Sequence, residues 1–310
     1  MNHPQPLFQG IVPPVVTPFT EAGDVDFDSL TRLVDSLIEA GVNGLFALGS
    51  SAEVAYLTDS QRVETVTAIV AAARGRVPVI GGAIDLTTAR VLERALDLQA
   101  AGVQAVVATA PIYALNDLTE TAEHFRSLAA GLNVPVYAYD VPVRVHSKLP
   151  AEFLVQLGTE GVIAGVKDSS GDDVGFRRLV ALNEAAGHPL QVLSGHEVIV
   201  DAMGLIGADG AVPGLANVDA AGYVRLWEAV QAGDWTLARS EQERLNRLFE
   251  IVFQDSGRSG DAAGIGAFKS AMHAQGLISH AGMAHPVQMP REAAVERIRG
   301  IVGSVALLPS

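Results

Sequence analysis

The feature that most limits how this chain can fold is a regular alternation of short apolar runs with longer stretches of helical period. Consecutive residues in each run are apolar, which is typical of parallel strands buried on both faces. Alternating strands and helices of this kind predict an α/β fold. The runs, rich in valine, isoleucine and alanine, are Gly10–Thr17, Gly44–Leu48, Val77–Ala83, Ala105–Ala110, Val134–Tyr139, Val162–Lys167, Leu190–Ser194 and Gly210–Pro213.

The stretches between the runs carry helix start and stop signals. Asp28–Ala40, Asp59–Ala73 and Thr87–Ala101 are amphipathic, and several such stretches end at a glycine. Eight strands, most followed by a helix, predict a (β/α)₈ TIM barrel over residues 10–230. An open, doubly wound sheet is the alternative. It would need a glycine-rich phosphate turn after its first strand, and Val15–Phe19 is not such a turn.

The remainder of the chain is predicted to be helical. Thr236–Phe253 and Ala263–Gln275 show the clearest helical period, and no low-complexity linker separates them from the barrel. We therefore predict two parts: a barrel in residues 1–230 that carries the catalytic site, and a helical extension in residues 231–310 packed on it.

Charge and composition exclude several functions. A formal charge of −14 and a pI near 4.9 disfavour sequence-independent nucleic-acid binding. The chain has no cysteine, which excludes disulfides and a thiol nucleophile. Neither a secretory signal in Met1–Gly10 nor a membrane-spanning stretch is visible. We expect a soluble, cytoplasmic protein that acts on small molecules and binds no membrane.

Lys167 closes the sixth apolar run and is one of only three lysines, with Lys148 and Lys269. A lysine at the end of a buried strand loses water, which favours the neutral amine that can attack a carbonyl. Such a site would lie at the carboxyl ends of the strands, where barrels carry their chemistry. The alternative is a structural lysine that pairs with an acid such as Asp168.

Other strand ends supply groups that fit a carbonyl chemistry. Tyr139 closes the run next to Lys167, so a phenol and an amine should lie side by side. Ser50 and Ser51 follow the second run and could hold a carboxylate, and Arg144 could clamp another. Taken singly, each has a structural alternative: a capping serine, a core tyrosine or a surface ion pair.

Metal sites find little support in the sequence. His196-Glu197 lacks the second histidine that a zinc helix requires. Asp168, Asp172 and Asp173 lack the spacing of a calcium loop, and helix capping explains them better. We predict no metal and no bound cofactor.

Five motifs in order resemble the dihydrodipicolinate synthase/N-acetylneuraminate lyase family of class I aldolases over nearly the whole chain. The family's Gly-[Ser/Thr]-[Ser/Thr]-Gly-Glu turn appears with alanine in place of its second glycine, and its Schiff-base lysine strand is matched at Lys167. The motifs are Thr17-Pro18-Phe19, Gly49-Ser50-Ser51-Ala52-Glu53, Tyr139-Asp140-Val141-Pro142, Gly165-Val166-Lys167-Asp168 and Ser194-Gly195.

The resemblance implies catalytic roles. Lys167 would form an iminium with pyruvate or another 2-keto acid, and Tyr139 would be the general acid/base. The Ser51 hydroxyl would connect Tyr139 to Tyr113, which in this family reaches in from a neighbouring subunit. The family therefore also implies a homo-oligomer, usually a tetramer built as a dimer of dimers.

The resemblance also implies how substrates bind. Ser50 and Ser51 would hold the keto-acid carboxylate, and the backbone near Val212 would line the pocket. Arg144 stands at the spacing of the dihydrodipicolinate synthase branch, where it receives the carboxylate of aspartate semialdehyde.

Four functions remain open. The leading interpretation is a Schiff-base lyase similar to dihydrodipicolinate synthase (4-hydroxy-tetrahydrodipicolinate synthase), which joins pyruvate to aspartate semialdehyde. The alternatives are a 2-keto-3-deoxy sugar-acid aldolase or dehydratase of the same mechanism, a catalytically silent barrel that senses a keto acid, and a metal-dependent aldolase.

Overall fold

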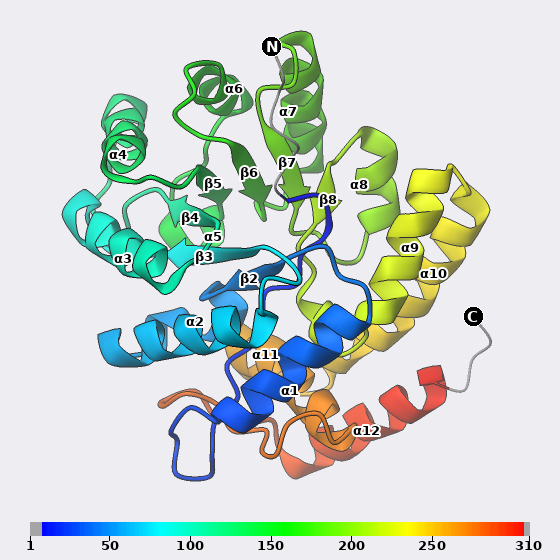
Figure 1. Cartoon of the computed structure of the whole chain (residues 1–310). Helices are drawn as coiled ribbons and strands as arrows, with labels where there is room; N and C mark the ends of the chain where they lie inside the picture. The colour runs from blue at the N-terminus through cyan, green and yellow to red at the C-terminus, as the bar shows by residue number, and fades with distance from the viewer. Residues whose placement is uncertain (1–7, 307–310) are drawn as a thin grey trace.

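Eight parallel strands form a curled sheet surrounded by helices in the computed structural model, which describes residues 8–306 (Figure 1). Every strand lies within one of the eight predicted apolar runs, except that β5 and β6 each extend one residue further. The strands are β1 (Gly10–Ile11), β2 (Leu45–Ala47), β3 (Val79–Ala83), β4 (Ala105–Thr109), β5 (Val136–Asp140), β6 (Gly165–Asp168), β7 (Gln191–Ser194) and β8 (Gly210–Ala211).

The sheet closes on itself. Its hydrogen-bonded order runs β1-β8-β7-β6-β5-β4-β3-β2. The segment after β1 then returns to β2 through the parallel bridge between Pro14 and Phe46, and the Val15 N–H donates to the Phe46 carbonyl at 2.9 Å. These contacts make the sheet a TIM barrel, as predicted, and not an open doubly wound sheet.

The helices largely match the predicted stretches, and α2 has the predicted bounds. The one-turn helix α5 was not anticipated; it begins at Pro142, where proline suits the first helical position, and it carries Arg144. The helices are α1 (Phe27–Glu39), α2 (Asp59–Ala73), α3 (Thr88–Ala101), α4 (Leu118–Gly131), α5 (Pro142–Val145), α6 (Ala151–Thr159), α7 (Asp173–Ala185), α8 (Val200–Ile206), α9 (Ala220–Ala232), α10 (Trp235–Phe249), α11 (Gly260–Ala274) and α12 (Glu292–Ala306), with 3₁₀ turns η1 (Ser50–Ala52), η2 (Val54–Tyr56), η3 (Gly214–Asn217) and η4 (Glu250–Phe253).

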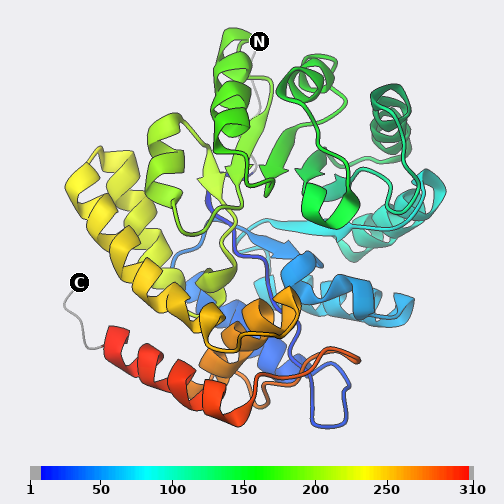
Figure 2. The ribbon, with the colours of Figure 1, turned by 180° about the vertical axis from the view of Figure 1, so that it is seen from behind.

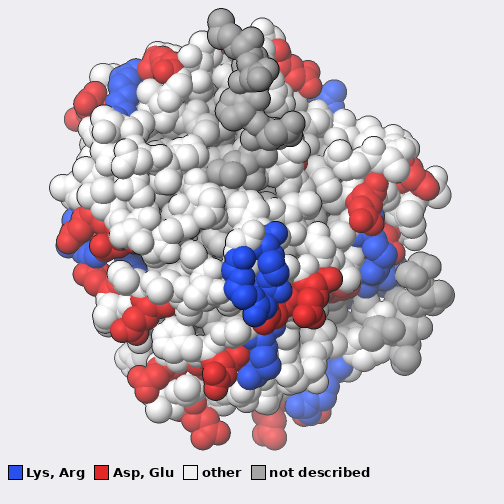
Figure 3. Space-filling model, viewed as in Figure 1, with Lys and Arg blue, Asp and Glu red and all other residues white. Residues whose placement is uncertain are grey.

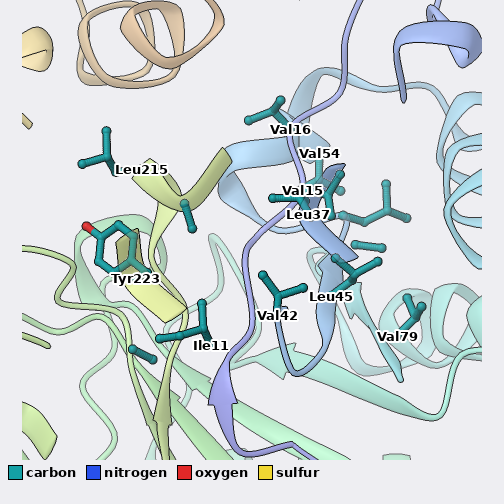
Figure 4. Close-up of a cluster of buried hydrophobic side chains, with 14 of the residues drawn as sticks. Ile11, Val15, Val16, Leu37, Val42, Leu45, Val54, Val79, Leu215 and Tyr223 are labelled. Atoms are coloured by element: carbon teal, nitrogen blue, oxygen red, sulfur yellow. The ribbon is translucent and has the colours of Figure 1, made fainter. Parts of the chain in front are cut away.

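Two hydrophobic cores hold the barrel. The larger lies between the sheet and its helices and includes Ile11 of β1, Leu45 of β2 and Leu37 of α1 (Figure 4). The smaller fills the barrel interior and includes Phe46 and Tyr139. Alternate residues of each strand face the two cores, so each strand is buried on both faces. This burial explains why consecutive residues in each run are apolar.

The chain continues after the barrel into further helices, as predicted. α10 lies along α9, α12 lies on α10 and α11, and α11 packs against η3 and η4 (Figures 1 and 2). The predicted boundary after Val230 falls within the last turn of α9. The division into two parts at that position stays a prediction.

The surface carries charges of both signs. On the face shown in Figure 3, acidic side chains are spread around the rim and along the lower edge, and a group of basic side chains with acidic neighbours lies near the centre. Within residues 8–306, no helix is both long and apolar enough to cross a bilayer.

His124 of α4 ties the helix layer to the end of β4. Its Nε2 lies 3.2 Å from the Thr109 carbonyl and its Nδ1 lies 3.0 Å from the Thr88 hydroxyl, which assigns the proton to Nε2. Burial lowers the pKa of this imidazole to about 4, although the Thr109 carbonyl opposes the shift. The ring is therefore neutral in the folded protein at pH values where it is protonated in the unfolded chain.

The free energy of unfolding should fall as the pH is lowered from about 6.5 towards 4, with a His124 contribution of up to about 1.4 kcal/mol per pH unit. The unfolded state binds the proton first in this window, so acid favours unfolding. Urea denaturation of the wild type and of His124→Gln between pH 7 and 4.5 measures this contribution. Parallel pH dependences in the two proteins would contradict it.

Candidate active site

The side chains at the carboxyl ends of neighbouring strands share one level of the barrel. Thr109 of β4 pairs in register with Tyr139 of β5, which pairs with Lys167 of β6, which pairs with Leu193 of β7. In a parallel sheet, residues in register project to the same face. Tyr139 and Leu193 belong to the cluster inside the barrel, so Thr109 and Lys167 point inward with them.

Lys167 and Tyr139 are in direct contact, as predicted from the sequence. The Lys167 Nζ lies 3.0 Å from the Tyr139 hydroxyl and 4.1 Å from the centre of its ring. The Phe46 ring lies 5.0 Å from the same nitrogen and meets the Tyr139 ring edge to face. Lys167 as a whole is 6% exposed, and its amine lies over the faces of these two rings. The alternative of a strand-end lysine paired with Asp168 is not observed, because Asp168 lies near Lys148 instead.

The surroundings of the Tyr139 phenol favour its ionised form. Burial opposes its ionisation, but the Lys167 ammonium and hydrogen bonds from Lys167, Ser50 and Ser169 together lower the pKa of Tyr139. A phenol whose pKa is shifted toward neutrality by an adjacent amine is suited to carry protons to and from a reacting oxygen.

The serine turn is held in a strained conformation. Leu48 and Glu53, at its two ends, both have a φ of 57° in the left-handed region. A Cβ at Gly49 would lie 2.6 Å from the Phe46 ring, so glycine is required there. Ala52, which replaces the second glycine of the motif, is accommodated because the left-handed residue is its neighbour Glu53.

A cavity of about 250 Å³ opens above this row of side chains. Its wall includes Ser50, Thr109, Tyr139 and Arg144. Lys167 lies behind this wall and is hydrogen-bonded to Tyr139. A larger hollow of about 520 Å³ lies between α6 and α7 on the outside of the barrel. We place the site at the first cavity, because only this one reaches the strand-end chemistry.

Of the other predicted residues, some lie at the candidate site and one does not. Ser50 helps to lower the pKa of Tyr139, and Ser51 follows it in the same turn. Val212 lies in the barrel interior, and its N–H donates to the Ser194 carbonyl at 2.7 Å, so only its side chain and carbonyl can face a ligand. Tyr113 is 91% exposed and is not brought to the cavity within this chain. Its role, and that of Ser51 as its link, stay predictions.

Glu197 was considered from the sequence only as part of a metal site, and its place near Lys167 was not predicted. It accepts a hydrogen bond from the Leu215 N–H at 2.6 Å. Burial raises the pKa of its carboxyl to about 7, while the N–H groups of Leu215 and Gly214 and the nearby Lys167 ammonium oppose the rise. The group can therefore gain or lose a proton near neutral pH. Its position two residues after the Ser194-Gly195 motif was a sequence signal for this placement.

Two further contacts come from the C-terminal helices and were also missed. Lys269 of α11 forms an ion pair with Glu53 in which both side chains are fully buried. Asp261, in the first turn of the same helix, pairs with Arg144 at the cavity mouth. α11 thus contributes to both the serine turn and the cavity wall.

Comparison with known proteins identifies the family. The profile of the dihydrodipicolinate synthetase family matches residues 7–302. The chain belongs to this family. Its members are lyases, so this protein is an enzyme of that class. A DapA-like lyase of Halobacterium salinarum that is described as uncharacterized is 35% identical over 259 residues, 83% of each chain. A 4-hydroxy-tetrahydrodipicolinate synthase of Phenylobacterium zucineum is 32% identical over 253 residues, 81% of this chain and 84% of that protein.

Solved structures agree with this assignment. The prophage protein YagE of E. coli K12, solved in complex with pyruvate, superposes with a TM-score of 0.90 at 26% identity over 97% of this chain and 100% of that one. A monomeric dihydrodipicolinate synthase variant shares the fold with a TM-score of 0.91 at 24% identity, over 99% of this chain and 100% of that one.

Proposed function

We propose that this lyase forms a Schiff base between Lys167 and pyruvate or another 2-keto acid. The observation that carries the proposal is the 3.0 Å contact between the Lys167 amine and the Tyr139 hydroxyl beneath the cavity. Membership of the family supports it, as does the similarity to YagE, which was solved with pyruvate bound.

The side chains suit each step of this chemistry. The Lys167 amine attacks the keto carbon, and Tyr139 delivers the proton with which the carbonyl oxygen leaves as water. The cationic iminium then withdraws electrons, so the adjacent carbon can lose a proton and become an enamine. Ser50 and Ser51 hold the keto-acid carboxylate in this proposal, and Val212 lines the pocket beside it.

The second substrate is an aldehyde in the same proposal. Aspartate semialdehyde is one candidate, supported by relatives named 4-hydroxy-tetrahydrodipicolinate synthase. The other is an aldehyde derived from a 2-keto-3-deoxy sugar acid, with cleavage or dehydration as the reaction. It is supported by the pairing of Arg144 with Asp261, which leaves no uncompensated positive charge for a second carboxylate.

We also propose that the active enzyme is a homotetramer built as a dimer of dimers. Tyr113 is exposed and held at a φ of 73°, a strained conformation for tyrosine. A partner subunit that used this side chain would explain both features. Light scattering during gel filtration measures the mass, and a fully active monomer would contradict the proposal.

Borohydride trapping tests the Schiff base. Reduction of the enzyme in the presence of pyruvate should add a reduced pyruvyl group to Lys167, which peptide mass mapping locates. Modification in the absence of borohydride should be reversible. Folded protein with no adduct on Lys167 would overturn the proposal.

Tyr139→Phe should lower kcat by about 10²–10⁴-fold, because the variant keeps the ring and loses the proton carrier. The adduct on Lys167 should still form under borohydride, but more slowly than in the wild type. Single-turnover trapping with pyruvate follows this rate. An unchanged rate would remove Tyr139 from the proton-transfer role.

A further inference from the structure

An ion pair stands at the mouth of the cavity where a substrate carboxylate would have to bind. The Arg144 Nη1 lies 3.3 Å from the Asp261 Oδ2, and its Nη2 bonds the Asp261 Oδ1. The Tyr56 hydroxyl donates to the same Oδ2 at 3.0 Å. Both oxygens of Asp261 are therefore engaged, and the Asp261 side chain is only 10% exposed.

This arrangement removes the charge that would attract an anionic substrate. The charges of Arg144 and Asp261 sum to zero, and an entering carboxylate would meet the Asp261 carboxylate as well as the Arg144 guanidinium. Hydrogen bonds from Arg144 and Tyr56 keep the pKa of Asp261 low in spite of burial, so the residue stays ionised at neutral pH. Like charges in such a partly enclosed site repel.

The rest of the wall is mostly aliphatic. Thr109, which is 1% exposed, has a hydroxyl that makes no hydrogen bond to any other residue that the structure describes. A buried hydroxyl of this kind can serve one oxygen atom of a ligand. The aliphatic residues of the wall are Val54, Ala55, Ile84, Ile112, Val141 and Val145.

We propose that Asp261 determines specificity by neutralising Arg144, and that the acceptor is an uncharged aldehyde with a short, mainly apolar chain. The inference rests on the proposed Schiff-base function. In the reaction, the enamine carbon forms a bond to the aldehyde carbon, and the aldehyde oxygen takes a proton from Tyr139. Water then releases the 4-hydroxy-2-keto acid and restores the Lys167 amine.

Butanal and succinate semialdehyde are a matched pair of probes, because the second replaces the terminal methyl of the first by a carboxylate. With pyruvate, the wild type should give a higher kcat/KM with butanal. Asp261→Asn keeps the shape but removes the negative charge. This substitution should raise the ratio of kcat/KM with succinate semialdehyde to kcat/KM with butanal by about tenfold or more. The double variant Asp261→Asn with Arg144→Met should lose that gain.

Asp255→Asn is the control, because Asp255 also pairs with an arginine, Arg291, but does not line the cavity. Its ratio should equal that of the wild type. If turnover is slow, the exchange of pyruvate methyl protons with solvent can be followed instead. The concentration of each aldehyde that inhibits this exchange then compares how well the two aldehydes bind.

The outcomes separate the two proposals. A wild-type preference for succinate semialdehyde, an unchanged ratio in Asp261→Asn, or binding of neither aldehyde overturns the specificity proposal while pyruvate still traps on Lys167. Failure of pyruvate to trap on Lys167 overturns the Schiff-base function itself.

Discussion

Lys167→Ala should abolish turnover and pyruvate trapping and leave the barrel folded. In the proposed mechanism the amine supplies the covalent bond to the substrate, and no other lysine contacts Tyr139 among residues 8–306. The substitution also removes a cation from a mainly aromatic surrounding, so it costs the fold little. Steady-state kinetics, trapping and thermal unfolding measure the three effects.

Lys167→Arg is the matched control for this result. Arginine keeps the positive charge beside Tyr139, but a guanidinium is protonated at all working pH values and cannot form the Schiff base. Both variants should therefore be inactive. Activity in Lys167→Arg would show that the residue acts through its charge alone.

Lys269→Met should destabilise the protein by about 3–5 kcal/mol, because it leaves the buried Glu53 carboxylate without its counter-charge. Lys269 is fully buried, pairs with Glu53 and donates to the Gly282 carbonyl at 2.9 Å. Glu53 also accepts from the Ala284 N–H at 2.8 Å. Urea denaturation measures the loss. The KM for pyruvate should rise as well, since Glu53 ends the serine turn.

Two controls distinguish the effect of breaking this buried ion pair from the effect of removing any surface charge. Arg299→Met removes an exposed ion pair with Glu296 and should change stability by about 0.5 kcal/mol or less. The double variant Glu53→Gln with Lys269→Met should recover part of the loss, because no buried charge is then unpaired. Equal effects of Lys269→Met and Arg299→Met would contradict a special role for the buried pair.

Local sequence information was sufficient to predict the barrel and the contact between the two residues at the centre of the candidate site. Parallel strands bring successive strand ends together, so the ends of the fifth and sixth runs placed Tyr139 beside Lys167. Apolar runs and helix signals located the elements, and α2 was predicted to the residue. These features depend on neighbours in sequence or on adjacent strands.

The parts of the site that were not predicted depend on contacts distant in sequence. Asp261 meets Arg144 from 117 residues away, and Lys269 meets Glu53 from 216 residues away. No local pattern distinguishes these acids and bases from surface ones. Thr109 lies in an apolar run, where its inward direction follows only from the register with Tyr139.

The ion pair between Glu53 and Lys269 also has a consequence for synthesis of the chain. The serine turn is made early, but the group that neutralises its buried carboxylate lies in α11, among the last elements to leave the ribosome. Until α11 docks, the turn holds an unpaired acid. The serine turn therefore gains its counter-charge only after the C-terminal helices are made, so its final conformation depends on the last part of the chain to be synthesised.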